Sequence, residues 1–160
     1  MKKKKFNLTA IELSDFHLIA IHTQHEPYKV AYLLNKRLET RFERRHKDLE
    51  LKVKTQLLSF PVFEYYNQDW DTTSLLISNR VSVEEQKTTS ENLFEKEPIT
   101  STDYVLNTNK QVDYLLKFDD TLNTFEPEEV VQKLITTPHI SMAYSLETQT
   151  LKHPEHLILD

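Results

Sequence analysis

The first decisive stretch of the sequence is Phe16-His-Leu-Ile-Ala-Ile-His22, a short apolar run with polar chain on either side. Its length and its β-branched residues are typical of a buried strand. After a polar loop, Glu26 and Pro27 open a pattern of apolar residues at three- and four-residue spacing that continues to about residue 37. Proline is favoured in the first turn of a helix, so we expect an amphipathic helix over residues 27–37.

The same order of elements recurs further along the chain. The run Val112-Asp-Tyr-Leu-Leu-Lys-Phe118 predicts a second strand, and Glu126 followed by Pro127 predicts a second helix over residues 127–136. The units 15–38 and 113–135 are either two strand–helix–strand modules that share one sheet or a chance likeness, since Glu-Pro is a common helix opening.

Between these units the sequence favours strands. Residues 49–53 alternate between apolar and charged, and residues 55–105 contain apolar and aromatic runs separated by turn residues, as in a β meander. Residues 38–45 fit either a half-exposed strand or a continued helix. We further expect a polar surface loop at 84–102, and strands at 104–106, 139–146 and 157–159.

Together these elements predict an α+β fold in a single domain, residues 1–160, with two helices on one face of a mostly antiparallel sheet. The other face of the sheet should then be either solvated or a contact surface.

The chain contains no glycine and no cysteine. Phosphate-binding loops of the GxGxxG and P-loop types need glycine at fixed positions, so both are excluded. Thiol nucleophiles, disulfides and cysteine-based metal centres are excluded as well. Turns must therefore rely on other residues, and we expect asparagine in the left-handed positions and few two-residue hairpins. The candidates are Asn67, Asn79, Asn107, Asn109 and Asn123.

Charge is distributed unevenly along the chain. The formal net charge is -5, made up of +6 in residues 1–60 and -11 in residues 61–160. The run Lys2–Lys5 lies in an expected flexible basic tail, residues 1–6, and no apolar segment follows it as in a secretion signal. The longest apolar stretch is far shorter than a membrane helix needs, so we expect a cytoplasmic protein without a membrane partner.

Two loops carry candidate ligand-binding residues. His22, His25 and Glu26 lie between the first strand and its helix, and Asp119 and Asp120 follow the second strand. Imidazole and carboxylate groups could hold zinc or magnesium, but a helix N-terminus disfavours a cation and acids there commonly complement the helix dipole. We therefore treat these residues as candidates for a small ligand, and predict no metal site and no cofactor.

A basic cluster follows the first helix. Arg41, Arg44, Arg45 and Lys47 are candidate nucleic-acid contacts. Asp113 would point to the face of its strand opposite to its neighbours, where it either meets solvent or pairs with Arg41, Arg44 or Arg45.

The chain resembles the IPExxxVDY family of small Bacteroidetes proteins over nearly its whole length. The resemblance rests on Leu18-Ile-Ala-Ile-His-Thr23, on the helix Tyr28–Leu38, on Asp48-Leu49 and on Val112-Asp-Tyr114. The Ile-Pro-Glu part of the motif is replaced here by Leu106-Asn107-Thr108. The resemblance implies a cytoplasmic bacterial protein and assigns no activity, cofactor or catalytic residue.

No catalytic motif emerges from these patterns, so we expect no enzyme activity. The leading hypothesis is an interaction or regulatory protein that acts through a sheet surface on a protein partner or as a homodimer. The alternatives are a small-ligand sensor of the ACT-like kind, which would bind at loop 22–26 or 119–126, and an RNA-binding accessory protein.

Overall fold

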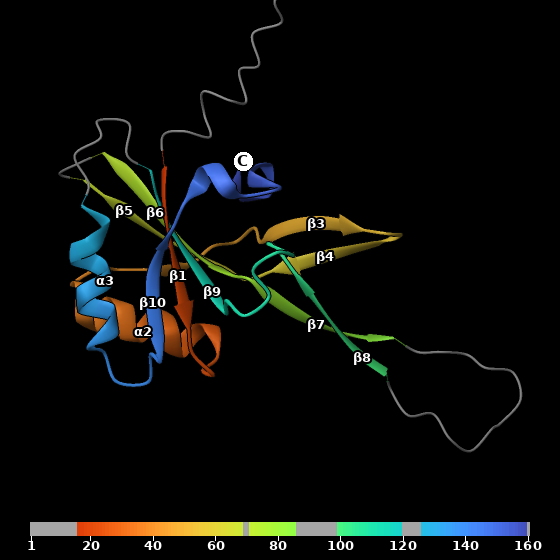
Figure 1. The fold of residues 1–160 in the computed structure, drawn as a ribbon, viewed down its shortest axis with the longest axis horizontal. Helices are drawn as coiled ribbons and strands as arrows, with labels where there is room; N and C mark the ends of the chain where they lie inside the picture. Colours follow the sequence, from red (N-terminus) through yellow and green to blue (C-terminus); the bar gives the residue numbers. More distant parts are fainter. Residues whose placement is uncertain (1–15, 69–70, 86–98, 120–125, 160) are drawn as a thin grey trace, which may run out of the picture.

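The structure is a computed structural model that describes residues 16–68, 71–85, 99–119 and 126–159 (Figure 1). The basic tail 1–6, Asp120, Asn123 and most of the expected loop 84–102 lie outside the described residues. No helix in the described ranges is long and apolar enough to cross a membrane.

The fold is α+β, as the sequence predicts, and is built on a six-stranded sheet in the order β10-β1-β9-β6-β5-β2. Every neighbouring pair in this sheet is antiparallel. Its strands are β1 (Phe16–His22), β2 (Glu43–Arg44), β5 (Val62–Asn67), β6 (Thr72–Ser78), β9 (Tyr114–Asp119) and β10 (Met142–Leu146).

Two helices pack on one face of this sheet, which confirms the expected arrangement (Figure 1). They are α2 (Pro27–Leu38) and α3 (Pro127–Ile135), and each begins at a proline. Val30 and Leu34 of α2 and Leu134 of α3 are fully buried against Ile19, Ile21, Leu76 and Leu116 of the sheet. The apolar stripes seen in the sequence therefore form one core layer.

The opposite face of the sheet is neither solvated nor free, which corrects our expectation. Two antiparallel ribbons and the C-terminal segment cover it, and Figure 1 shows them on the side away from the helices. The ribbons are β3 (Leu49–Val53) with β4 (Gln56–Phe60), and β7 (Arg80–Glu85) with β8 (Ile99–Tyr104); the C-terminal segment holds two short 3-10 helices, η1 (Thr148–Thr150) and η2 (Pro154–Leu157). Leu157 is fully buried there with Leu18, Ile77 and Leu115.

The ribbons leave the sheet where two long strands are interrupted. β4 continues into β5 across Pro61, and β6 continues into β7 across Asn79. Asn79 is fully buried, and its side chain donates to the carbonyls of Asn109 and Val112 and accepts from the amide of Leu106. The residue expected only to turn the chain thus satisfies the backbone of a buried loop.

Several segment boundaries differ from the sequence prediction. α2 ends at Leu38, and residues 39–42 are neither strand nor helix before the two-residue β2. The expected loop 84–102 contains the end of β7 and the start of β8, and residues 105–106 lie beyond β8. The expected strand 157–159 is absent from the described residues, because the chain there forms η2 and then irregular backbone.

Left-handed backbone occurs at other residues than asparagine. In the described residues the positive φ angles belong to Glu39, Lys54, Asp71 and His139. Lys54 and Thr55 form a two-residue hairpin, since Val53 pairs directly with Gln56. The positive φ angles correct our expectation of asparagine, whereas one two-residue hairpin agrees with the few that we expected. A left-handed conformation costs about 1–2 kcal/mol for a residue with a Cβ atom.

The two strand–helix–strand units are placed differently in the sheet. In the second unit, β9 and β10 lie on either side of β1, so a single strand separates them. β1 and β2 have three strands between them, because β2 forms the far edge.

Candidate functional site

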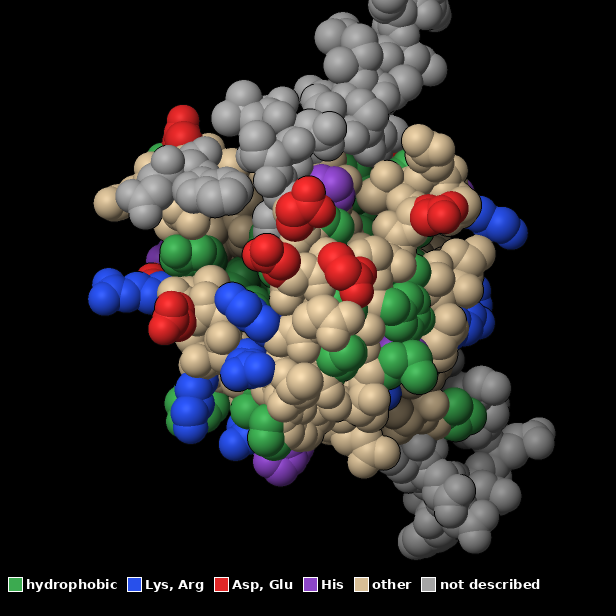
Figure 2. All heavy atoms as spheres, turned by 60° about the vertical axis from the view of Figure 1, so that its left-hand side comes forward, with side chains coloured by type: hydrophobic (Ala, Val, Ile, Leu, Met, Phe, Trp, Pro, Cys, Tyr) green, Lys and Arg blue, Asp and Glu red, His purple; other side chains and the backbone are tan. Residues whose placement is uncertain are grey.

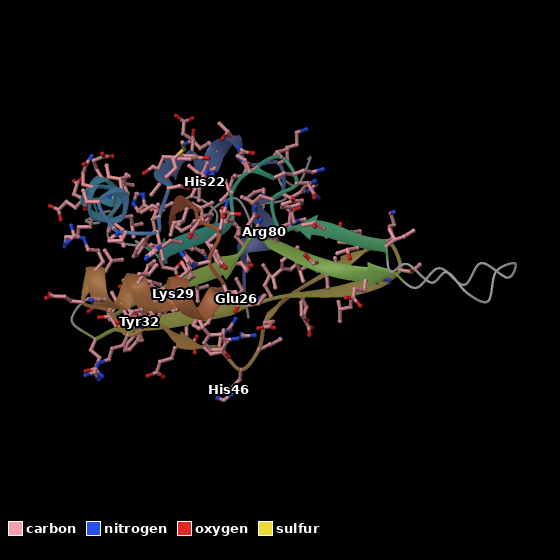
Figure 3. The ribbon with its side chains drawn as sticks, turned by 90° about the horizontal axis from the view of Figure 1, so that it is seen from below. His22, Glu26, Lys29, Tyr32, His46 and Arg80 are labelled. Carbon is pink, nitrogen blue, oxygen red and sulfur yellow. The ribbon has the colours of Figure 1, made fainter. Side chains whose placement is uncertain are left out.

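The loop between β1 and α2 is held by residues from the start of β9. The amide of Thr23 donates to the carboxylate of Asp113 at 2.8 Å, and the hydroxyl of Tyr114 donates to the carbonyl of His25 at 2.7 Å. Arg80 completes the arrangement with an ion pair to Asp113 at 3.1 Å. In Figure 3, Arg80 is labelled near the middle of the molecule, with His22 above it and His46 at the lower margin.

Asp113 therefore has a structural role with a different partner from those we considered. Its side chain is 16% exposed and pairs with Arg80 rather than with Arg41, Arg44 or Arg45. The carboxylate joins the β1–α2 loop to the first residue of β7, since it contacts both Thr23 and Arg80.

Burial raises the pKa of the Tyr114 hydroxyl to about 12. Arg80 opposes this effect, while Asp113 and Glu26 add to it. The hydroxyl is consequently neutral and able to donate its hydrogen bond at ordinary pH.

The histidines of this loop are occupied by neighbouring groups. His22 Nε2 lies 3.1 Å from the hydroxyl of Tyr144 on β10, and the His25 ring meets the His139 ring edge-on at 4.7 Å between centroids. Glu26 is exposed at the N-cap of α2 and makes no side-chain capping bond.

Asp119 does not join these residues in one site. It pairs with Phe16 at the start of β1, whereas His22 ends that strand, so the two candidate loops lie at opposite ends of the sheet. The carboxylate of Asp119 instead forms an ion pair with Lys117 at 3.4 Å.

Two of the basic candidates are engaged within the fold. Arg44 forms an ion pair with Asp48, donates to the carbonyl of Val62 at 3.1 Å and lies 5.7 Å from the centre of the Phe63 ring. A hydrogen bond with Asp48 is the largest cause that raises the pKa of Arg44. Arg45 pairs with Glu64 at 3.5 Å.

The other basic candidates lie close to acidic groups or in solvent. Arg41 lines a shallow surface hollow together with Glu43 and Glu64. Lys47 is exposed. On the face that Figure 2 shows, Lys and Arg side chains lie beside Asp and Glu side chains. Arg44 and Arg45 therefore have a structural explanation within the fold.

The two edges of the six-stranded sheet differ strongly. At one edge, β2 is two residues long and consists of Glu43 and Arg44. At the other edge, β10 is five residues long, carries no charged residue and pairs within the described chain only with β1. Proteins usually guard an exposed edge with short length, charge or proline. β2 is guarded in this way and β10 is not.

The side chains of β10 suit a contact with another strand. Met142 is 53% exposed, Tyr144 and Leu146 are half-buried, and Ser145 is exposed on the other face. The sequence indicated a half-buried strand at 139–146, but sheet order depends on long-range pairing, so the pattern alone did not identify it as an edge.

Comparison of the chain with protein-family models, curated proteins and solved structures found no match.

Proposed function

We propose that this protein is a non-enzymatic interaction protein that assembles with a second copy of itself through strand β10. The single observation that carries the proposal is the five-residue, uncharged edge of the sheet at Met142–Leu146. Alternate backbone amides and carbonyls of an edge strand point outward, and another strand can pair with them.

A second copy fits this edge without any further partner. An antiparallel strand pair can be related by a two-fold axis, so one strand is complementary to its own copy. If the axis passes near Tyr144, Met142 of one chain faces Leu146 of the other. That cross-strand pair would bury two apolar side chains that are exposed or half-exposed in the single chain.

Helix α3 would enlarge the interface. It packs against β10, and its last residue, Ile135, is 44% exposed. Pairing of two β10 strands would bring the α3 helices of both copies onto the same side of the joined sheet. The helix matters because a five-residue strand pair alone falls short of the roughly 800 Å² that each partner buries in a typical stable interface.

The edge is favoured over a sheet face because both faces are covered by apolar layers. It is favoured over RNA binding because Arg44 and Arg45 already contact Asp48 and Glu64. It is favoured over a small-ligand site at the loop 22–26 because His22 and His25 already contact Tyr144 and His139.

Light scattering of the purified chain tests the proposal. We expect a molar mass that rises with concentration toward twice the 19.0 kDa of one chain. Ser145→Lys places a charge on the exposed face of β10 and should shift the equilibrium to monomer. A wild-type chain that stays monomeric to millimolar concentration would refute the proposal.

Ser59→Lys is the matched control. Ser59 is also an exposed serine within a strand, but it lies on β4 and pairs with Glu50 of β3. The control adds the same charge and should leave the dimer intact. Equal dissociation by both variants would mean that net charge, rather than the β10 edge, governs assembly.

A further inference from the structure

A second group of side chains, unrelated to the β10 edge, gathers at the C-terminal segment. His153, Glu155 and His156 each place a potential metal-ligating atom within 4.8 Å of the others. Nδ1 of His153 lies 3.0 Å from the carboxylate of Glu155, and the two imidazole rings stack with 5.0 Å between their centroids.

The orientation of His156 is fixed by the main chain of a distant segment. Its Nδ1 lies 3.1 Å from the carbonyl oxygen of Val105. A carbonyl oxygen only accepts, so Nδ1 must carry the proton and Nε2 of the neutral ring keeps its lone pair. Histidines that bind metals commonly donate their other N–H to a backbone carbonyl in this way.

The backbone that carries the three residues is well anchored. The amide of His156 donates to the carbonyl of His153, and Leu157 is fully buried in the core layer beneath the ribbons. Val105 is itself held by a 2.8 Å bond from its amide to the carbonyl of the buried Asn79. His156 is therefore attached to a fixed part of the fold.

Glu155 is suited to act as an anionic ligand. Its carboxylate already lies 3.0 Å from Nδ1 of His153, and carboxylate oxygens are common zinc ligands. His153 and Glu155 are 58% and 52% exposed, so both side chains can rotate toward an ion. Ligand atoms on one tetrahedral zinc lie about 3.3 Å apart, so a modest rotation is sufficient.

We propose that His153, Glu155 and His156 form a binding site for a divalent transition-metal ion such as Zn²⁺. Two imidazoles and one carboxylate match the ligand preferences of zinc and its neighbours, whereas Mg²⁺ and Ca²⁺ prefer oxygen ligands alone. Three ligands from the chain leave one position of a tetrahedral ion for water or for a group from another molecule. Leu157 of η2 is buried in the core between the sheet and the ribbons, so metal binding at η2 would stabilise the folded chain.

Calorimetric titration of the untagged full-length chain with Zn²⁺ tests this site. We expect one Zn²⁺ per chain and a higher melting temperature when Zn²⁺ is in excess. His156→Asn is the sharpest variant, because the Asn amide can still donate to Val105 while the Nε2 ligand is removed. It should lower zinc affinity about tenfold or more while circular dichroism stays unchanged, and His153→Ala should do the same.

His46→Ala is the control, since His46 is an exposed histidine on the loop between β2 and β3. Its zinc affinity should equal that of the wild type. The site is refuted if His153→Ala and His156→Asn bind Zn²⁺ as tightly as the wild type, or if Mg²⁺ at equal concentration displaces the zinc.

Discussion

The amide of Thr23 and the carboxylate of Asp113 form a 2.8 Å hydrogen bond although 90 positions separate them in the chain. The bond joins the loop after β1 to the residue before β9, at the centre of the sheet. The neighbours of Asp113 in the chain are also engaged. Val112 is fully buried, and the hydroxyl of Tyr114 donates to the carbonyl of His25. Val112-Asp-Tyr114 therefore holds in place the loop that leads into α2.

Asp113→Ala should destabilise the protein more than Arg80→Ala does. Loss of the carboxylate removes a charged acceptor of a backbone amide, which contributes about 1.5–3 kcal/mol. Arg80 is 46% exposed, and an exposed ion pair contributes only about 0–1 kcal/mol. Urea unfolding of the two variants measures the difference, and a larger loss for Arg80→Ala would show that the ion pair is the dominant contact.

Tyr114 should make stability depend on alkaline pH. Its pKa is raised from 10.0 to about 12 in the fold, chiefly by burial. A group whose folded pKa is raised contributes fully below its unfolded pKa, so the contribution is present up to pH 10 and is lost as the pH rises through about 12. Urea unfolding between pH 9 and 11.5 should show a steeper decline for the wild type than for Tyr114→Phe.

The control for this prediction is Tyr32→Phe, because Tyr32 is 56% exposed on α2. Its stability should decline with pH as steeply as that of the wild type. At pH 9, Tyr114→Phe should be less stable by about 1 kcal/mol through loss of its hydrogen bond to His25. Parallel pH profiles for the wild type and Tyr114→Phe would contradict the assigned role of burial.

Glu39→Gly should stabilise this glycine-free chain. Glu39 caps the C-terminus of α2 with φ 56° and ψ 40°, a left-handed conformation that glycine adopts without steric cost. After the greater freedom of glycine in the unfolded chain is subtracted, we expect a gain of about 0.5–1 kcal/mol in urea unfolding. Glu43→Gly, in extended β2, should lose about as much, and a loss for both variants would contradict the explanation.

Short sequence patterns correctly predicted the helices and strands whose structure depends mainly on their own residues. Pro27 and Pro127 begin the two helices as expected, and the apolar run at Phe16–His22 forms a central strand. The covering of the second face was not predictable in this way. It depends on the bend at Asn79, where a buried amide satisfies backbone groups from residues 106, 109 and 112.

The candidate sites were less predictable than the fold for the same physical reason. The sequence offered the loop at His22 and the loop after Asp119 as alternatives, and only the strand register shows that they lie at opposite ends of β1 and β9. β10 and β2 are the two edges because of the strand order, and a short stretch of sequence does not determine that order. His153 and His156 lie close in sequence, but the carbonyl of Val105 that orients His156 comes from 51 positions away.

Backbone hydrogen exchange at Met142–Leu146, measured at a low and a high protein concentration, tests the pairing of β10 most directly. In the proposed dimer, the amides of β10 that point away from β1 gain partners, so their exchange should slow as concentration rises. The amides of β4 should exchange at the same rate in both samples, and Ser145→Lys should abolish the slowing. Exchange in β10 that is independent of concentration across the range used for light scattering would contradict assembly through this edge.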